Sequence, residues 1–436
     1  MLNEIHKVII STPDFTESFD MRKLNFRSVK WRQCFYVLLC LIPIVVFFGM
    51  IWKYALNIPF WDDYDAVLLF LVKYSDTSTF FEKFKLVFSQ HNEHRIVFNR
   101  LVTLGQFYLN GTVDFRHLIF IGNIGLIGVL GVLYHSLKVK KHKLLFLVPI
   151  AFLLFQPQYW ENINWAMASL QNFYVIFFAF LSLLLVSKKG KGSLFGGLLF
   201  AILATFTQGN GMFVFPVGLG ILLYQRRYKA LPAWVLATLM CLLFYFNDYI
   251  QPAQHPSITE ALYHPVRTLH YFFSFIGSSL GFNNSSSLLI GMGVTAYFFA
   301  ITVKKYFKRN TLVYGLFCFL FISAAAAAAT RSGFGIEQAF ASRYSIVSIL
   351  FYILIYMSLI EIFPKLKKHI VFFIFTAISF NIYAYFSHVD SIVEQHNALS
   401  ESVIEWEASG QGLLFPDREG ANQRMMDAID KGIYTF

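Results

Sequence analysis

The chain has 436 residues, of which 56% are hydrophobic, 19% are aromatic and only 14% are charged. This balance excludes a disordered chain, a fibrous repeat and almost any soluble globular domain, and it predicts an all-α polytopic membrane protein. The 36 Lys and Arg residues outnumber the 25 Asp and Glu residues and give a formal charge of +11. Membrane proteins carry such an excess as an orientation signal, so we expect a lipid bilayer, and no nucleic acid, as partner.

Apolar runs predict the membrane crossings, each of which needs about 20 residues, or fewer where a helix is buried among others. They define a membrane domain at 34–386, between an N-terminal segment, 1–33, and a C-terminal segment, 387–436. Residues 268–282 are also apolar, but we expect a re-entrant or surface-lying helix there, because one more span would invert the loops that follow. The eleven predicted spans are 34–52, 117–135, 144–157, 166–187, 193–207, 212–224, 232–249, 287–303, 311–329, 344–362 and 369–386.

Basic loops predict the orientation, since cytoplasmic loops are enriched in Lys and Arg. Together with segment 1–33 and Glu361, these loops hold 23 of the 36 basic residues and 5 of the 25 acidic ones, which leaves 13 basic and 20 acidic residues for the other side. We therefore expect a multi-pass protein of the cell (inner) membrane with a cytoplasmic N-terminus, an outer C-terminal segment and a periplasmic or extracellular active face. The basic loops are 138–143, 188–191, 226–229, 304–309 and 365–368.

The polar motifs fall on the predicted outer face. WDDYD (61–65) follows the first span, and HNEHR (91–95) lies in the same outer connection. QPQYWENINW (156–165), TQGNG (207–211), TRSGFG (330–335) and ASRY (341–344) lie at the outer ends of later spans. A plain anchor has no reason to gather Asp, His, Glu, Arg, Trp and Asn on one surface, so we expect a functional site there.

The outer connection 53–116 is too long for a plain loop. Thr79 and Glu82 have capping-box spacing, and the Phe residues that follow recur on one helical face, which predicts an amphipathic helix on the membrane surface. A second helix is predicted at about 96–109. The two surface-lying helices would carry HNEHR back toward WDDYD.

An acidic pair after the first span, followed by two surface helices and a return span, resembles the GT-C superfamily of polytopic glycosyltransferases, such as the protein mannosyltransferases and the aminoarabinose transferases. The resemblance covers 34–249 and rests on topology and WDDYD; the last four spans align with no particular branch. It implies that Asp62 or Asp63 activates the acceptor. It also implies a polyprenyl-phosphate sugar as donor and a glycan, lipid or protein of the cell envelope as acceptor.

The residues themselves support the same chemistry. A carboxylate can accept the proton of an acceptor hydroxyl if burial or a like charge raises its pKa, and Asp62 and Asp63 are neighbours. A departing phosphate needs cations, for which Arg95, Arg100, Arg331 and Arg343 are the candidates. The candidates for contacts with the substrates are Trp61, Tyr64, Asp65, His91, Glu93, His94, Trp160, Glu161, Asn164, Gln208 and Asn210.

Other interpretations remain open for these motifs. WDDYD could be an interfacial belt with solvated aspartates, and Arg331 and Arg343 could be interface anchors. Asp63 and Asp65 form a D-x-D that could hold a divalent metal, but one such pair is weak evidence, so no cofactor and no metal ligand is assigned. The spacing of His91 and His94 fits neither metalloprotease zinc motif.

Two other functions are also open. One is an envelope polysaccharide polymerase or ligase that acts on a lipid-diphosphate donor through the outer arginines and histidines. The other is a lipid-linked sugar transporter or flippase, for which TQGNG between two short spans is the broken-helix pattern. The predicted spans have no Asp, Glu, Lys or Arg near their centres, which disfavours a coupled transporter.

Overall fold

The computed structural model describes residues 21–253 and 255–436, and this part of the chain is helical, without a β-strand. It contains nine helices that are long and apolar enough to cross a membrane by length and composition. The multi-pass helical class predicted above is therefore confirmed. The long helices are α1 (Met21–Tyr54), α5 (Phe115–Ser136), α6 (Lys143–Leu154) with α7 (Trp160–Ile163), α8 (Ala166–Ser187), α11 (Leu231–Phe246), α14 (Asn284–Val303), α15 (Thr311–Arg331), α16 (Ser345–Ile362) and α17 (Ile370–Ser409).

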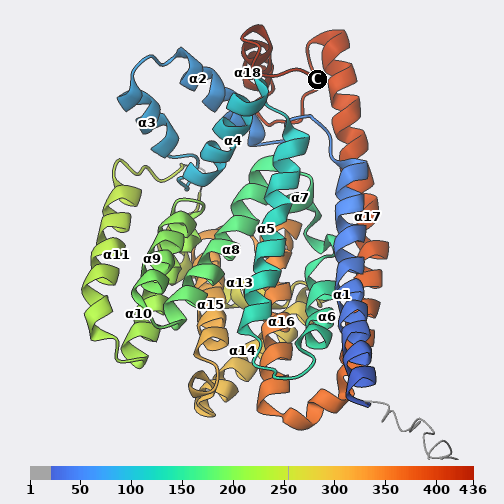
Figure 1. The fold of residues 1–436 in the computed structure, drawn as a ribbon. Helices are drawn as coiled ribbons and strands as arrows, with labels where there is room; N and C mark the ends of the chain where they lie inside the picture. Colours follow the sequence, from blue (N-terminus) through green and yellow to red (C-terminus); the bar gives the residue numbers. More distant parts are fainter. Residues whose placement is uncertain (1–20, 254) are drawn as a thin grey trace, which may run out of the picture.

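The predicted spans 193–207 and 212–224 form the shorter apolar helices α9 (Lys191–Thr205) and α10 (Val214–Tyr224). They run alongside α8 and α11 in the same bundle (Figure 1). Of the predicted segment 1–33, residues 1–20 lie outside the described residues, and α1 already begins at Met21.

The basic loops meet at one end of the bundle, which we call the basic end. Lys138 Nζ donates to the carbonyl of Arg309 at 2.6 Å, and Arg227 Nη1 donates to the carbonyl of Val186 at 2.6 Å. Loops that are far apart in the sequence therefore share this end, as the orientation argument requires. That this end faces the cytoplasm stays a prediction.

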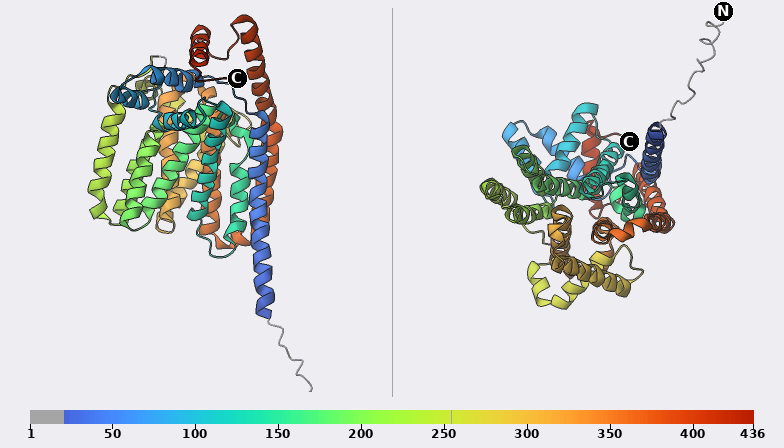
Figure 2. Two further views of the ribbon diagram at one scale, coloured as in Figure 1. Left: turned by 45° about the horizontal axis from the view of Figure 1, so that its top comes forward. Right: turned by 60° about the horizontal axis from the view of Figure 1, so that its bottom comes forward.

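Short helices cover the opposite end, which we call the outer end (Figure 2). The two helices predicted in the outer connection are present as α3 (Phe80–Phe88) and α4 (Val97–Asn110), and their place on the membrane surface stays a prediction. The Thr79 hydroxyl accepts from Glu82 N at 3.3 Å and donates to the Glu82 carboxylate at 2.7 Å, so the predicted cap is present. The sequence did not indicate the π-helix η2 (Tyr64–Leu69) and the helix α2 (Phe70–Asp76), which follow WDDYD directly.

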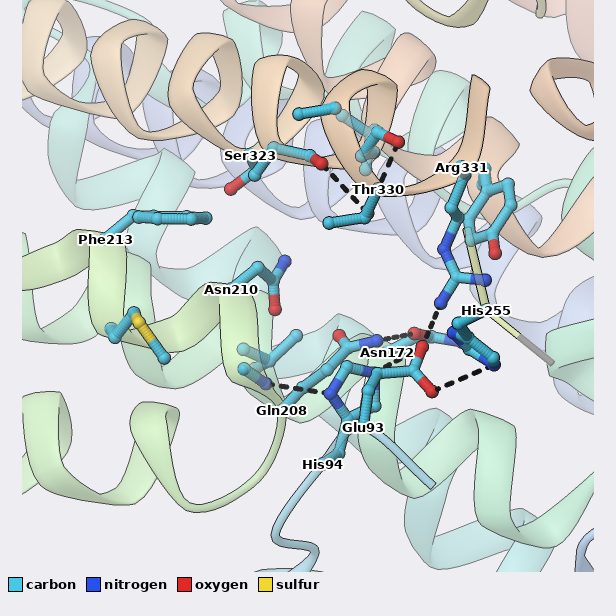
Figure 3. A pocket seen from close by; sticks show the side chains of 18 of the residues that line it. Glu93, His94, Asn172, Gln208, Asn210, Phe213, His255, Ser323, Thr330 and Arg331 are labelled. Atoms are coloured by element: carbon cyan, nitrogen blue, oxygen red, sulfur yellow. Dashed lines mark hydrogen bonds and ion pairs between the residues drawn. The ribbon is translucent and has the colours of Figure 1, made fainter. Parts of the chain in front are cut away.

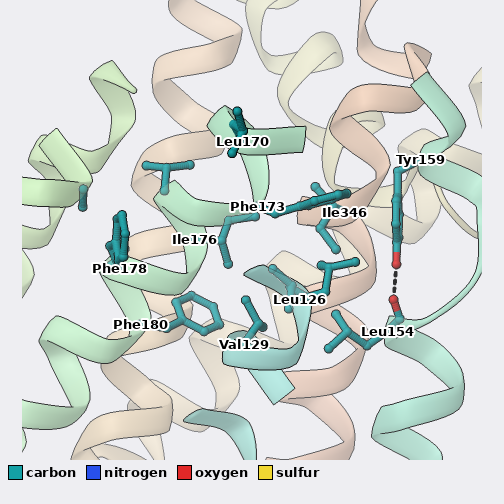
Figure 4. Close-up of a cluster of buried hydrophobic side chains, with 14 of the residues drawn as sticks. Leu126, Val129, Leu154, Tyr159, Leu170, Phe173, Ile176, Phe178, Phe180 and Ile346 are labelled. Atoms are coloured by element: carbon teal, nitrogen blue, oxygen red, sulfur yellow. Dashed lines mark hydrogen bonds between the residues drawn. The ribbon is translucent and has the colours of Figure 1, made fainter. Parts of the chain in front are cut away.

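Close helix contacts hold the bundle together. A Cβ atom on Gly122 of α5 would lie 2.0 Å from Ser169 Oγ of α8, so only glycine allows the two helices to approach this closely. Apolar side chains fill the space beside this contact, among them Leu126, Phe173 and Ile346 from α5, α8 and α16 (Figure 4). This core supports the outer ends of α8, α15 and α16, where the polar motifs lie.

The apolar segment predicted at 268–282 forms α13 (Pro265–Gly277), preceded by α12 (Ile258–Tyr263). Near its start, Thr268 Oγ1 lies 3.2 Å from Ser332 Oγ, and just after its end Ser279 Oγ donates to the carbonyl of Ser345 at 3.0 Å. Ser332 belongs to the motif TRSGFG, and Ser345 directly follows the motif ASRY. The helix therefore begins and ends near the outer end, which fits a surface-lying or re-entrant helix.

The predicted C-terminal segment, 387–436, begins as the continuation of helix α17 and not as a separate tail. Helix α17 has 40 residues, about 60 Å at the usual rise per residue, and continues past the predicted span to Ser409 beside α1 (Figures 1 and 2). The chain then returns through α18 (Arg418–Asp430) onto η2. Val113 N donates to the carbonyl of Ile433 at 2.8 Å, and Lys431 forms an ion pair with Asp76. Residues 410–436 are thus folded over the outer connection.

Candidate functional site

A cavity of about 450 Å³ lies at the outer end of the bundle. Polar side chains from separate parts of the chain point into it (Figure 3). Glu93 and His94 come from HNEHR, Gln208 and Asn210 from TQGNG, and Arg331 from the end of α15. Arg343 and Tyr344 of ASRY also line it, so the structure brings together four of the outer motifs that the sequence placed on the same face.

A tight turn presents the HNEHR side chains. His91 N donates to the carbonyl of His94 at 2.7 Å, and His94 N donates to the carbonyl of His91 at 2.9 Å. Asn92 sits inside this turn with φ 46°, a left-handed conformation that asparagine tolerates better than most residues. The turn directs Glu93 and His94 toward the cavity.

Glu93 is surrounded by groups that carry or can carry positive charge. Its carboxylate forms an ion pair with Arg331, and its two oxygens lie 3.5 Å from His94 Nε2 and 3.6 Å from His255 Nε2. Burial by itself would raise the pKa of Glu93, but His94, Arg331 and His255 outweigh it and hold the pKa at about 2. Glu93 is therefore an ionised partner that orients Arg331, and it is no proton acceptor near neutral pH.

His94 links HNEHR to TQGNG. The Gly209 N–H donates to His94 Nδ1 at 3.4 Å, so the imidazole proton lies on Nε2 and faces Glu93. Burial lowers the pKa of His94 despite the neighbouring Glu93. A Cβ atom on Gly209 would come within 2.8 Å of Tyr245 Oη and 3.2 Å of His94 Nδ1, so the contact needs glycine.

A second ion pair borders the cavity. Arg343 Nη1 contacts Glu161 Oε1 at 3.1 Å, and the Arg343 N–H and the Ser342 hydroxyl donate to Glu161 Oε2 at 3.1 and 2.8 Å. Arg343 and Arg331 both lie over the ring of Tyr344, at 5.2 and 5.7 Å from its centroid. The cavity is thus lined by two guanidinium groups that share the Tyr344 ring, each paired with one carboxylate.

Helices α8, α15 and α16 and the short 3-10 helix η4 (Gly209–Phe213) line an apolar part of the cavity. The alanine run 324–329 of α15 contributes Ala326, Ala327 and Ala329, whereas Ala324 and Ala328 are fully buried in the core. Their small side chains leave space that Phe213, Phe319 and Val347 border. The cavity is polar at the arginines and apolar between the helices.

The three aspartates of WDDYD have separate surroundings. Asp62 is half-buried beside the cavity, and burial together with the charges of Asp65 and Glu93 raises its pKa to about 6, although Arg343 opposes this. Asp63 is fully buried and accepts from Met167 N at 2.9 Å and Phe60 N at 3.2 Å. Asp65 pairs with Arg424 of α18 at 2.7 Å.

Asp62 does not line the cavity itself, but it is the aspartate of the three whose pKa responds to Glu93 and Arg343, which do. Asp63 holds the N-terminus of α8, where backbone N–H groups lack partners within the helix. Its burial raises its pKa to about 7 against the backbone hydrogen bonds. Since Asp63 and Asp65 point to different partners, the D-x-D does not form a chelating pair. Among the residues that the structure describes, no group of three or more His, Cys, Asp and Glu could hold a metal ion.

Two of the four predicted phosphate ligands lie elsewhere. Arg95 donates to the carbonyls of Tyr245 at 2.6 Å, Phe88 at 2.5 Å and Asn247. Arg100 Nη1 donates to three carbonyls, those of Leu86, Val87 and Ser89, at 2.6–3.1 Å, and so caps the C-terminus of α3. Both guanidinium groups are used by the backbone, which corrects their assignment to phosphate binding.

Several predicted substrate contacts also lie away from the cavity. Tyr64 is buried against Phe415, Trp61 is half-exposed on the surface, and His91 does not line the cavity. Burial and Arg100 lower the pKa of His91 to about 4. Asn164 is buried without a hydrogen-bond partner among the described residues. Trp160 and Glu161 border a second cavity, described below.

The structure adds residues that sequence reasoning missed. Asn172 connects Gln208 and Asn162 by hydrogen bonds of 3.0 and 2.7 Å, and His255 completes the ring around Glu93. Asn172 stood out only as one of few polar residues within a span, and His255 belongs to no motif.

The chain matches no protein-family model, and neither the curated proteins nor the solved structures include a match.

Proposed function

We propose that this chain is a membrane glycosyltransferase that transfers a sugar from a polyprenyl-phosphate donor to a cell-envelope acceptor on the outer face. One observation carries the proposal: a cavity that is cationic at Arg331 and Arg343 continues between apolar side chains of α8 and α15, beside a carboxylate with a raised pKa. The expected GT-C-like architecture is part of this proposal.

The donor phosphate would lie at the two arginines. Glu93 is the sole hydrogen-bond acceptor of the Arg331 guanidinium among the described residues, which leaves other N–H donors for a ligand. Guanidinium groups bind phosphate through paired charge-assisted hydrogen bonds. The prenyl chain would lie against Ala326, Ala327 and Phe319, where the cavity is apolar. Such a donor also suits an outward site, because sugar nucleotides are made on the other side of the membrane.

Asp62 would act as the general base. A carboxylate with a pKa of about 6 is ionised at pH 7 and remains basic enough to accept a proton. As the acceptor oxygen bonds to the anomeric carbon, its proton passes to Asp62 and the bond from that carbon to the phosphate oxygen breaks. Arg331 and Arg343 stabilise the charge on the departing polyprenyl phosphate.

The test is transfer by the purified full chain in proteoliposomes, from a panel of polyprenyl-phosphate sugars to extracted envelope glycans and lipids. Asp62→Asn should lose about 10²–10⁴-fold in transfer rate. Asp76→Asn, an exposed aspartate that pairs with Lys431, is the matched control. Full activity of a folded Asp62→Asn protein would refute the mechanism.

A second candidate is a polymerase or ligase that acts on a lipid-diphosphate donor. It is favoured by the fact that Glu93, His94, His255 and Arg331 line the cavity directly, whereas Asp62 lies beside it. It predicts that Arg331→Gln and His94→Gln abolish transfer from a lipid diphosphate while Asp62→Asn does not. The same set of variants therefore separates the two reactions.

A further inference from the structure

A second cavity, of about 670 Å³, lies on the other side of the Glu161–Arg343 ion pair. Glu161 and Ser342 line this cavity, and Arg343 lines the first one. The Ser342 hydroxyl donates to Glu161 at 2.8 Å, and Glu161 in turn contacts Arg343 at 3.1 Å. The Glu161–Arg343 ion pair thus joins a residue that lines the second cavity to one that lines the first.

The lining of the second cavity combines aromatic rings with serine and glutamine side chains, and it also includes Glu161 and His388. Trp160, Phe340 and Tyr383 supply rings from three separate elements, and the loop that follows α13 supplies Ser278 and Ser279. Within the described part of the chain, no Lys or Arg lines this cavity, so it lacks the phosphate-binding groups of the first. A sugar ring needs this combination, because it has apolar C–H faces and a rim of hydroxyl groups.

Gln158 provides an acceptor that is fixed in place. Its side chain is only 7% exposed, and its Nε2 donates to the carbonyl of Ser279 at 2.8 Å. The other amide atom, Oε1, is buried and has no hydrogen-bond partner among the described residues. Buried polar atoms are normally paired, so an unpaired carbonyl oxygen on a residue that lines a cavity indicates a ligand that donates a hydrogen bond.

We propose that the second cavity binds a neutral saccharide, with the ring against the aromatic side chains and a hydroxyl donating to Gln158 Oε1. This binding does not depend on the proposed reaction. The identification of the saccharide as the acceptor does rest on that reaction: Glu161 would then separate the acceptor from the guanidinium group that holds the donor phosphate.

The test is photolabelling of the full chain in lipid nanodiscs without any donor lipid. The probes are octyl glucoside, octyl galactoside and octyl mannoside that carry a diazirine on the sugar, with diazirine-bearing octanol as the sugar-free control. We expect at least one glycoside to label 278–282 or 380–388, and excess of the same glycoside without diazirine to remove the label. Labelling no stronger than that by the octanol probe, for all three glycosides, would overturn the proposal.

Two substitutions on α17 give a matched pair. Ser387 lines the cavity, whereas the adjacent Phe386 is 83% exposed and does not. Ser387→Trp should reduce the glycoside label at least fivefold, and Phe386→Trp should leave it unchanged. An equal effect of both substitutions would contradict the assignment.

A third substitution separates the second cavity from the first. Arg331→Gln removes a cation from the first cavity and should leave the glycoside label unchanged. If the unaltered chain is labelled by the glycoside but shows no transfer activity, only the proposed reaction is refuted. Loss of the label in a folded Arg331→Gln protein would refute an independent second site.

Discussion

Glu93 and Arg331 are 238 positions apart in the sequence, and their side chains form an ion pair inside the first cavity. About four fifths of each side chain is buried. Glu93 lies in a turn of the outer connection and Arg331 at the end of α15, so this contact joins the outer connection to a late helix of the bundle. His94 and His255 flank the carboxylate and fix its direction.

The proposed function requires Arg331 to bind a phosphate in addition to Glu93. Arg331→Gln should lower kcat/KM for transfer about 10²–10³-fold, the usual cost of removing one donor that stabilises a developing negative charge. Arg331→Lys should retain part of the activity because it keeps the charge but loses the paired geometry. The exposed Arg418 offers a control as Arg418→Gln. Undiminished kcat/KM in Arg331→Gln would contradict the role of Arg331.

Arg100 should matter for stability instead. Arg100→Gln leaves the carbonyls of Leu86, Val87 and Ser89 without their cationic donor, and hydrogen bonds of this kind contribute about 1.5–3 kcal/mol each when they involve a charged group. We expect a lower melting temperature in detergent and an unchanged affinity for polyprenyl phosphate. Loss of affinity at an unchanged melting temperature would restore Arg100 as a phosphate ligand.

Asp63 and Asp62 should differ in their effect on folding. Asp63→Ala removes the acceptor of Met167 N at the start of α8, and the loss of such a cap costs about 0.5–2 kcal/mol. Asp62 holds no comparable position, so Asp62→Ala should lower the melting temperature less. Thermal unfolding of the two variants, followed by circular dichroism, checks the order. Equal or reversed shifts would contradict the assignment of Asp63 to the helix terminus.

His91 should make the fold sensitive to acid. Its pKa is lowered from 6.5 to about 4 by burial and by Arg100, so the unfolded chain binds the proton at a higher pH than the folded protein does. The stability is therefore fully present above about pH 6.5 and decreases as the pH falls toward 4. At 1.36 kcal/mol per pKa unit, the loss reaches up to about 3 kcal/mol.

His91→Gln should flatten this dependence of the melting temperature between pH 6.5 and 4. The matched control is His117→Gln, since the side chain of His117 is 60% exposed at the start of α5. An unaltered pH dependence in His91→Gln would show that other groups cause the acid sensitivity.

Local features of the chain predicted much of the fold. The amphipathic pattern and the capping-box spacing that begins at Thr79 correctly located α3, and the apolar runs located the long helices. The C-terminal segment was harder to predict, because polar residues after 386 continue the helix of α17 instead of ending it. Helix-forming residues are compatible with water as well as lipid, so hydrophobicity marks where a span ends but not where its helix ends.

For the candidate site, too, the sequence predicted the general location but not the role of each residue. The polar motifs lie at one end of the bundle, as hydrophobicity and charge predict, since polar side chains are excluded from the lipid core and basic loops set the orientation. The roles of individual residues depend on contacts that no local pattern records. Arg95 and Arg331 are both outer arginines in the sequence, yet Arg95 donates to the backbone and Arg331 faces the cavity.

The two neighbouring aspartates of WDDYD show that residues adjacent in the sequence can have different surroundings. Asp62 and Asp63 adjoin in the chain, but one is half-buried beside the cavity and the other is enclosed at the start of α8. The helical class and the outer position of the polar motifs follow from composition, spacing and charge, because each of these is a property of short stretches of chain. Which carboxylate and which guanidinium groups meet is decided by long-range packing, since it depends on how α8, α15 and the outer connection approach one another in space.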